Sequence, residues 1–315
     1  MSSKKIYIYS PSGAVRDKKS FKLGTSRLKE LGYQVQVDPD ALTSYQRFAG
    51  DDHTRLKAII RAASSNANIA LISRGGYGLT RLLPFIPFKN IAKSINKGTK
   101  FVGISDFTAF QSALLSKTGA ISWAGPGLCE GFGLSGVIDL KTGKNAVHQD
   151  EIMEACFDDL IIGQGEGAGW RVSKDVPEKS LQINDAILWG GNLTVLTSLI
   201  GTPYFPLIKG GILFLEDVAE PPYRIERMLS QLVHSGVIKN QKAVLWGQFT
   251  GYSLTSHDRG FNEKSAINYL RQSSKTPILT NLPYGHVPTK ILLPVGAKVN
   301  LTLNDRNALL YWGSL

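Results

Sequence analysis

One serine of the sequence lies where it could act as a nucleophile. Ser105 stands in Gly-Ile-Ser-Asp-Phe (103–107), where an apolar stretch ends and residues typical of a helix begin. A strand-to-helix junction of this kind exposes a hydroxyl above a sheet, although Phe107 replaces the second glycine of the usual G-x-S-x-G elbow. The alternative is that Ser105 only caps the following helix, as serine often does. This segment alone leaves both interpretations open.

A glycine-rich turn, Ser-Arg-Gly-Gly-Tyr-Gly (73–78), follows another apolar run at 69–72. Glycines let the backbone N–H groups of a turn point outward, where they can bind an anion or a developing oxyanion. The spacing fits neither a phosphate-binding loop nor a dinucleotide fingerprint, so we do not expect a nucleotide here. Strand-to-helix junctions of an open parallel sheet share its carboxyl edge. We therefore expect Ser105 to face Gly75 and Gly76, unless the turn is purely structural.

A serine nucleophile needs a base, and His286 is the best candidate among five histidines. It lies in Leu-Pro-Tyr-Gly-His-Val-Pro (282–288), where two prolines limit the freedom of the loop. The other four histidines lie at helix ends or among polar neighbours; they are His53, His148, His234 and His257. A constrained histidine with a structural role is the alternative.

The imidazole in turn needs a carboxylate that orients it. Glu216 ends the apolar segment Gly-Gly-Ile-Leu-Phe-Leu (210–215), so we expect its carboxylate to be partly desolvated. Asp217 competes for this role. Because side chains alternate along a strand, only one of the two should reach the site.

These side chains require a sheet that brings them to one edge. Apolar or alternating strands are predicted at 6–9, 34–37, 69–72 and 101–104, with helices at 17–31, from 51 onward and at about 106–115. Strands and helices that alternate in this way predict an α/β fold with a parallel sheet and right-handed crossovers. The second part of the chain repeats the pattern less regularly, with strands at 186–189, 211–215, 243–246, 277–282 and 299–303 and a helix at 223–234.

The regular pattern breaks in the middle of the chain. Gly-Gln-Gly-Glu-Gly-Ala-Gly (163–169) and the mostly polar residues up to 180 are typical of an exposed linker or surface loop. We therefore predict an N-terminal nucleophile domain at 1–135, a linker region at 136–180, and a C-terminal domain at 181–315 that carries the glutamate and the histidine.

Composition narrows the class of protein. Of the 315 residues 43% are hydrophobic and 19% charged, which favours a packed core. No apolar run reaches the roughly 20 residues of a membrane helix, and the N-terminus has no signal-peptide core, so we expect a cytoplasmic protein without a membrane partner. Cys129 and Cys156 are expected to be reduced thiols.

The net charge of +11 could indicate a nucleic-acid partner, but the basic residues are scattered along the chain. A solvated surface, or attraction of a substrate with carboxylates, accounts for them better, and we expect no nucleic acid. Histidines, cysteines and carboxylates do not recur with metal-ligand spacing, which predicts no metal.

Together these motifs resemble one family. The resemblance rests on 73–78, on Gly-Ile-Ser-Asp (103–106), on Trp-Gly-Gly-Asn-Leu (189–193), on Leu-Glu-Asp (215–217) with Pro-Tyr-Arg-Ile-Glu-Arg-Met-Leu (222–229), and on Tyr-Gly-His (284–286). The chain resembles the LD-carboxypeptidases of murein recycling, whose relatives include the microcin C self-immunity peptidases.

The resemblance implies roles for individual residues. It implies Ser105 as nucleophile, His286 as general base, Glu216 as the carboxylate that orients it, and an oxyanion hole from the N–H groups of Gly76 and Asp106. It also implies a glutamine amidotransferase-like N-terminal domain, a swivelling α/β C-terminal domain, a homodimer with the site between the domains, and no cofactor. Two residues of the glycine-rich turn, Arg74 and Tyr77, are candidates for binding the substrate, although Arg74 could equally be exposed or structural.

The implied reaction is hydrolysis of the L,D-peptide bond to the terminal D-alanine of a small murein peptide, through an acyl-enzyme. The segment 134–180 matches no pattern of the family, which leaves the substrate open. One alternative is a microcin-type immunity peptidase that cleaves peptidyl-nucleotides or acyl-sulfamoyl adenylates. A non-catalytic relative that binds carboxylated ligands is another.

Overall fold

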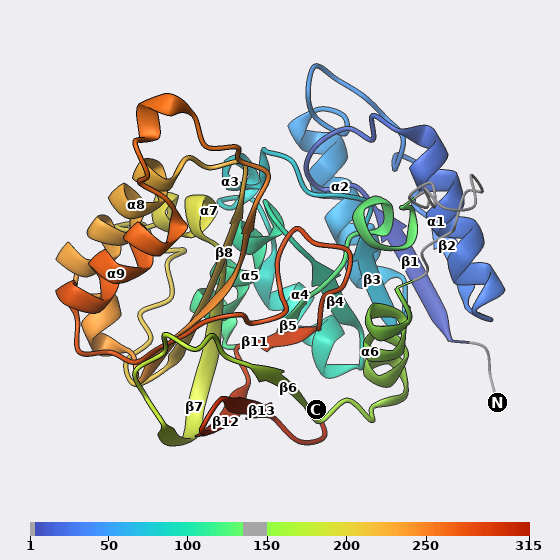
Figure 1. The fold of residues 1–315 in the computed structure, drawn as a ribbon. Helices are drawn as coiled ribbons and strands as arrows, with labels where there is room; N and C mark the ends of the chain where they lie inside the picture. Colours follow the sequence, from blue (N-terminus) through green and yellow to red (C-terminus); the bar gives the residue numbers. More distant parts are fainter. Residues whose placement is uncertain (1–3, 135–149) are drawn as a thin grey trace, which may run out of the picture.

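The computed structural model describes residues 4–134 and 150–315 and contains two β-sheets side by side (Figure 1). The first sheet has the strand order β11-β5-β4-β3-β1-β2 and the second has the order β10-β9-β8-β7-β12-β13-β6. The strands of the first are β1 (Lys5–Tyr9), β2 (Gln34–Val37), β3 (Ile69–Ile72), β4 (Lys100–Gly103), β5 (Ser122–Ala124) and β11 (Leu293–Val295). Those of the second are β6 (Gly167–Arg171), β7 (Ser180–Asn192), β8 (Ile212–Val218), β9 (Ala243–Thr250), β10 (Ile278–Leu279), β12 (Lys298–Asn304) and β13 (Asn307–Tyr311).

Helices cover both faces of the first sheet, whose strands β1 to β5 are parallel. The helices are α1 (Lys18–Glu30), α2 (Asp52–Ser64), α3 (Leu79–Leu82), α4 (Phe88–Asn96), α5 (Phe107–Thr118) and α6 (Glu151–Ile162). Alternate residues of β1 pack on opposite sides: Ile6 and Ile8 belong to a core with α1 and α6, whereas Tyr7 and Tyr9 belong to a core with α2, α4 and α5. Continuous apolar strands such as β3 are therefore buried on both faces, which confirms the predicted α/β sheet.

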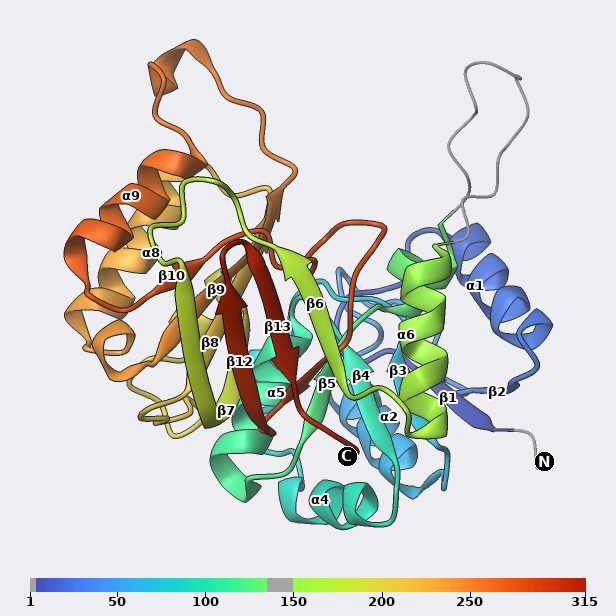
Figure 2. The same cartoon turned by 60° about the horizontal axis from the view of Figure 1, so that its bottom comes forward.

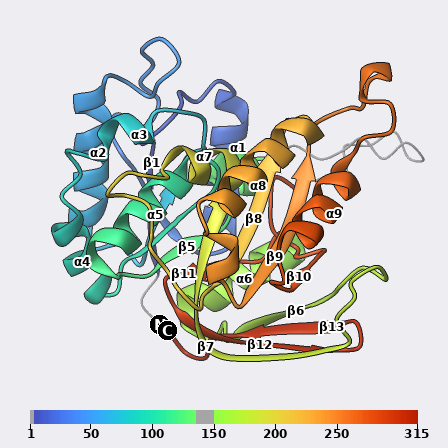
Figure 3. The ribbon, with the colours of Figure 1, turned by 90° about the vertical axis from the view of Figure 1, so that its left-hand side faces the viewer.

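The second sheet is mixed. Strands β7 to β10 are parallel, whereas β12, β13 and β6 extend the sheet antiparallel from β7. Its helices are α7 (Leu193–Ser198), α8 (Pro222–His234) and α9 (Glu263–Ser273), and α8 and α9 pack together beside β8 and β9 (Figure 3). One buried apolar cluster runs from α5 of the first sheet into β7, β8 and β9 of the second, so the two sheets share a core.

The sequence predicts a surface loop for the glycine-rich segment, but from Gly167 onward this segment forms a strand. Residues Gly167–Arg171 form β6, an edge strand that pairs with β13. A Cβ on Gly167 would lie 2.7 Å from the carbonyl oxygen of Leu310, so the small residue allows the strands to approach. Its partner lies about 140 residues further along the chain, and for this reason local composition does not reveal the strand. The predicted boundaries at 135 and 180 stay predictions.

The chain crosses between the sheets near its C-terminal end. Strand β10 ends at Leu279 in the second sheet (Figure 2), and β11 begins at Leu293 in the first (Figure 1). The intervening loop, 280–292, carries His286 and therefore lies where the two sheets meet.

Two further observations bear on the sequence predictions. Cys129 and Cys156 are both free and partly buried, as expected for reduced thiols. Among residues 4–134 and 150–315, no helix combines the length and the apolar character that crossing a membrane requires.

Candidate active site

Ser105 occupies a strained turn between β4 and α5. Its φ angle is +67°, a left-handed conformation that residues with a side chain rarely adopt. Helix α5 begins at Phe107 and the residue at its N-cap is Asp106, so the alternative that Ser105 caps the helix is wrong. Within the described parts of the chain, the Ser105 hydroxyl has no hydrogen-bond partner. Strain at a residue with a free hydroxyl is typical of functional sites.

The glycine-rich turn lies against this serine, as expected from the shared edge of the sheet. A Cβ on Gly75 would come within 2.5 Å of the Ser105 Cβ and 2.9 Å of its Oγ. Gly76 and Gly78 have φ angles of +124° and +126°, which favour glycine. The turn can therefore approach Ser105 closely only because it lacks side chains at these positions.

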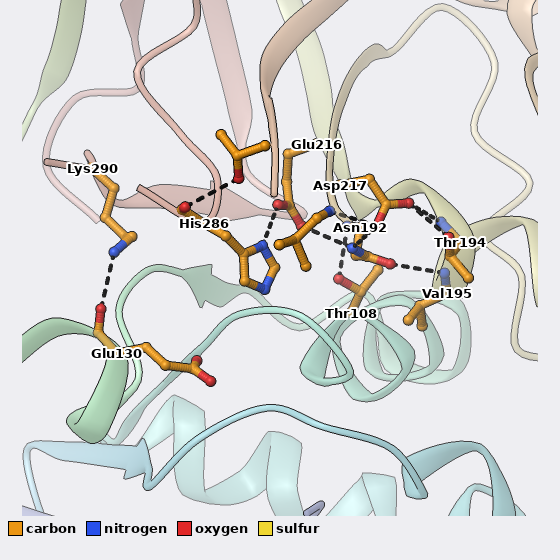
Figure 4. A network of polar contacts seen from close by, with 11 residues as sticks. Thr108, Glu130, Asn192, Thr194, Val195, Glu216, Asp217, His286 and Lys290 are labelled. Atoms are coloured by element: carbon orange, nitrogen blue, oxygen red, sulfur yellow. Dashed lines mark hydrogen bonds and ion pairs between the residues drawn. The ribbon is translucent and has the colours of Figure 1, made fainter. Parts of the chain in front are cut away.

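Glu216 and His286 form a close pair. Glu216 lies in β8 and is fully buried, and its Oε2 is 2.7 Å from Nδ1 of His286 (Figure 4). The ring points from its loop toward the helix that carries Thr108 (Figure 4). Because Nδ1 is bonded to the carboxylate, Nε2 is the nitrogen that remains for another partner.

The surroundings of His286 favour its protonated form. Burial disfavours the charge, but the neighbouring carboxylates, Glu216 first among them, together raise the pKa of His286 above the ordinary 6.5. Glu130 and Asp217 add to the increase. A negative charge beside the ring stabilises an imidazolium, the state that a general base reaches after it accepts a proton.

Asp217, the competing carboxylate, has a different role. It accepts hydrogen bonds from the Thr194 amide at 2.9 Å, the Thr194 hydroxyl at 2.7 Å and Nδ2 of Asn192 at 2.8 Å. It thus binds the first turn of α7, where a negative charge is favourable. As predicted, only one of the two acidic neighbours, Glu216, contacts the imidazole.

Asn192 and Thr108 connect the histidine side of the site to the serine side. Asn192 Nδ2 lies 3.3 Å from Oε1 of Glu216, and its backbone N–H donates to the Thr108 hydroxyl at 3.0 Å (Figure 4). The Thr108 amide in turn donates to the Ser105 carbonyl at 2.9 Å. Sequence reasoning missed both residues as parts of the site, although Trp-Gly-Gly-Asn was among the motifs.

The two candidates for substrate binding lie in the glycine-rich turn. Arg74 donates weakly to the Ala14 carbonyl at 3.3 Å, and its Nε lies 3.9 Å from Oε1 of Glu130. Tyr77 is 47% exposed, and its ring packs near Phe48. The structure therefore leaves the Arg74 guanidinium with only loose partners.

A buried lysine, also missed from the sequence, holds the loop of His286. Lys290 is 1% exposed, and its Nζ lies 3.4 Å from the Glu130 carbonyl (Figure 4) and 3.5 Å from the Pro288 carbonyl. Burial lowers its pKa. Glu130 belongs to the π-helical turn η1 (Leu128–Phe132), so Lys290 links the histidine loop to the N-terminal part of the chain.

A cavity of about 390 Å³ opens beside the ends of β8 and β9. Asp217 and Thr250 are part of its wall, and the Thr250 hydroxyl donates to the His286 carbonyl at 3.3 Å. Its other lining residues are Glu220, Pro222, Ile225, Phe249, Tyr252, Leu254, Asn262, Glu263 and Lys264. The cavity thus combines an apolar wall with carboxylates.

Comparisons with known proteins identify the family. The model of the LD-carboxypeptidase N-terminal domain matches residues 6–125, and that of the LD-carboxypeptidase C-terminal domain matches residues 185–301. A crystal structure of muramoyltetrapeptide carboxypeptidase from Oxalobacter formigenes is 36% identical, with a TM-score of 0.85 and 99% of each chain covered.

The chain belongs to the LD-carboxypeptidase family. It is a peptidase, and the family implies the serine type. Both the resemblance in the motifs and the expected two-part α/β architecture are thereby confirmed.

Other LD-carboxypeptidase relatives cover most of the chain. A probable murein peptide carboxypeptidase of Bacillus subtilis is 28% identical and covers 91% of this chain and 85% of its own length. The microcin C7 self-immunity protein MccF, at 19% identity, has a TM-score of 0.83 over 100% of this chain and 98% of the other. At this identity the second likeness shows the fold alone.

Proposed function

We propose that this member of the LD-carboxypeptidase family is a serine carboxypeptidase that hydrolyses the L,D-peptide bond to the terminal D-alanine of murein tetrapeptides. The observation that carries the proposal is the 2.7 Å contact between the buried Glu216 and His286. Asn192 and Thr108 link this pair to the strained turn of Ser105, whose hydroxyl has no hydrogen-bond partner among the described residues. The names of relatives that act on murein peptides support the substrate.

In the proposed first step, Oγ of Ser105 attacks the carbonyl carbon of the residue before D-alanine. Nε2 of His286 accepts the hydroxyl proton, while Nδ1–H remains bonded to Glu216. The carboxylate holds the ring in the tautomer whose Nε2 is a base and stabilises the imidazolium that forms. A bond forms between Oγ of Ser105 and the carbonyl carbon, and the π electrons of the carbonyl group move to the carbonyl oxygen.

The resulting oxyanion would be bound by the backbone N–H groups of Gly76 and Asp106. Gly75 lies against Ser105 without a side chain, which brings the glycine-rich turn within reach of an atom bonded to Oγ. Amides held in place before the reaction stabilise a developing charge without reorganising.

Collapse of the tetrahedral intermediate breaks the bond to D-alanine, whose nitrogen takes the proton from His286. The remaining peptide stays on Ser105 as an ester. A water molecule then attacks this acyl-enzyme while His286 accepts its proton, and the serine is released with the shortened peptide. Water is the one further reactant that this sequence of steps requires.

The terminal carboxylate of the substrate would be bound by Arg74, next to the exposed ring of Tyr77. Its weak contact to Ala14 and the 3.9 Å distance to Glu130 leave the guanidinium able to accept a carboxylate. A planar guanidinium can bind both oxygens of such a group.

The 390 Å³ cavity is where we place the side chain of the residue whose carbonyl is attacked. Ile225 and Phe249 provide an apolar wall for an aliphatic stem. Burial raises the pKa of Glu220 and of Glu263, so each carboxylate would gain from a cation nearby. Glu220 already pairs with Arg224 at 2.6 Å, which leaves Glu263 as the principal partner for the ammonium of a diamino acid.

The decisive experiment is incubation with a murein tetrapeptide that ends in D-alanine, with mass spectrometry of the products. We expect release of D-alanine, no cleavage of the diastereomer that ends in L-alanine, and loss of activity by several orders of magnitude in Ser105→Ala. Failure of the wild-type protein to release D-alanine would contradict the proposed substrate, and full activity of Ser105→Ala would remove Ser105 from the role of nucleophile.

The microcin-type activity is the second candidate, because the microcin C7 self-immunity protein of Escherichia coli is 26% identical over 74% of this chain. Hydrolysis of an acyl-sulfamoyl adenylate without release of D-alanine from the tetrapeptide would favour it.

The role in peptidoglycan recycling, the cytoplasmic location and the homodimer belong to the main proposal and rest on the family resemblance. Light scattering of the purified protein tests the dimer.

A further inference from the structure

We propose that the side chain of Asp106 is a positioning residue, which clamps the glycine-rich turn to the Ser105 turn and so sets the distance between the two amides of the oxyanion hole. This role is distinct from that of the Asp106 backbone N–H and rests on the proposed function.

The Asp106 carboxylate does not cap its own helix but caps another one. Asp106 is at the N-cap of α5, yet its side chain makes no capping bond there. Its Oδ2 instead accepts the N–H of Leu79 at 2.9 Å. Leu79 is the first residue of α3, and Gly78 at the N-cap of α3 has no side chain that could provide this bond. Asp106 therefore supplies the cap that α3 lacks, from a segment 27 residues away.

The remainder of the turn is fixed from other sides. The Gly13 amide donates to the Gly75 carbonyl at 3.2 Å, and Gly76 lies directly on the Gly13 backbone. At the opposite end, a Cβ on Gly78 would lie 2.7 Å from a guanidinium nitrogen of Arg55. The Gly76 amide thus lies between two points at which the turn is held. On one side Gly75 packs against Ser105, and on the other the Leu79 amide is hydrogen-bonded to Asp106.

A buried arginine accompanies the carboxylate. Arg55 is fully buried, pairs with Asp52, donates to the Pro11 carbonyl at 3.1 Å and stacks on Phe48. Burial raises the pKa of Asp106, whereas the Leu79 amide and the Arg55 charge oppose that increase. A buried carboxylate is costly unless it is hydrogen-bonded and compensated, and the Leu79 amide and the Arg55 charge offset part of this cost at Asp106.

Loss of the clamp would affect the transition state more than substrate binding. Without the carboxylate, the Leu79 end of the turn is released and the Gly76 amide can move away from the Asp106 amide. Loss of one oxyanion donor typically lowers kcat by about 100- to 1,000-fold. A residue that only stabilised the fold would lower the unfolding temperature without this change in kcat.

The test compares three variants, with release of D-alanine from the tetrapeptide as the readout. Asp106→Ala should lower kcat about 100-fold with KM within about threefold, since the change falls on an oxyanion donor. Asp106→Asn keeps one acceptor oxygen for Leu79 and should retain several times more activity. The matched control is Asp38→Asn: Asp38 is equally buried and bonded to Tyr7 and Arg61, away from the turn. It should lower the unfolding temperature but leave kcat within twofold.

Hydrogen exchange provides a readout that does not depend on activity. The Leu79 amide should be protected in the wild type and in Asp106→Asn and should exchange at least tenfold faster in Asp106→Ala. A kcat of Asp106→Ala equal to that of Asp38→Asn, or unchanged protection of Leu79, would overturn the clamp. If the wild-type protein releases no D-alanine, the proposed function fails, and the exchange measurement still decides whether Asp106 holds the turn.

Discussion

The carboxylate of Glu216 lies 2.7 Å from Nδ1 of His286, although 70 residues separate them in the chain. Glu216 is fully buried, and the loop of His286 is held by Thr250 and Lys290. Among the charges around the imidazole, Glu216 contributes most to raising its pKa. Several measurable consequences follow from the pair and its surroundings.

Activity should rise with pH. The pKa of His286 is raised above 6.5, against the effect of burial, chiefly by Glu216. The proposed base works only when it is neutral, so kcat/KM should increase through a pKa above 6.5. A pH profile measured between pH 5 and 9, with an NMR titration of His286, checks this. A flat profile across that range would contradict His286 as the base.

Removing the negative charge of residue 216 should shift this titration. In Glu216→Gln the raising effect of the carboxylate disappears while the burial remains, so the pKa of His286 should fall. The protonated, folded histidine also contributes stability below pH 6.5 that is lost as pH rises through its raised pKa, and the variant should lose this contribution. Activity should decrease by about 100-fold or more because the ring is no longer oriented. Asp217→Asn is the comparison: it leaves the contact between Glu216 and His286 in place and should lower the pKa of His286 less than Glu216→Gln does.

Replacement of Ser105 should separate activity from stability. The φ angle of +67° costs a residue with a side chain about 1 kcal/mol, which glycine avoids. We therefore expect Ser105→Gly to be inactive and at least as stable as the wild type, and Ser105→Ala to be inactive without a gain. Thermal and urea unfolding measure the difference. A clear loss of stability in Ser105→Gly would argue against strain at this turn.

A methyl group on Gly75 should disable the site. The added Cβ would lie 2.5 Å from the Ser105 Cβ, so either the serine or the turn must move. We expect Gly75→Ala to lower kcat at least 100-fold, as for a displaced nucleophile or oxyanion donor. Gly169→Ala is the matched control, because its Cβ would meet its nearest neighbour at 3.7 Å. Wild-type kcat in Gly75→Ala would show that the contact is not needed.

Glu263 should determine how tightly a cationic side chain binds. In Glu263→Gln, the acceptor for the Trp246 indole N–H is kept but the charge is lost. KM for a tetrapeptide with a free side-chain ammonium should rise at least tenfold, as for a hydrogen bond to a charged group worth about 1.5 to 3 kcal/mol, with little change in kcat. The same substrate with an acetylated ammonium should not distinguish the two proteins. Equal KM values for the free ammonium would remove Glu263 from this role.

Much of the first sheet, and the types of residue at the candidate site, could be predicted from the sequence. Continuous apolar runs such as 69–72 predict buried parallel strands, and the structure confirms them. The residue types at the strand ends predict that Ser105 faces the glycine-rich turn, and the contact with Gly75 confirms it. These features follow from local composition and from the geometry of parallel sheets.

Other features required the folded chain. The polar residues before 180 do not reveal that Gly167–Arg171 pairs with β13. Local sequence likewise could not show that Asn192 bonds to Thr108 or that the Asp106 carboxylate caps α3 instead of its own helix.

The types of residue at the ends of the strands could be predicted from the sequence, because strand and helix signals act over a few neighbouring residues. Which of those side chains meet became clear from the three-dimensional structure. Contacts such as Glu216 with His286 and Asp106 with Leu79 depend on how two sheets pack around a common core, and that packing is a property of the whole chain.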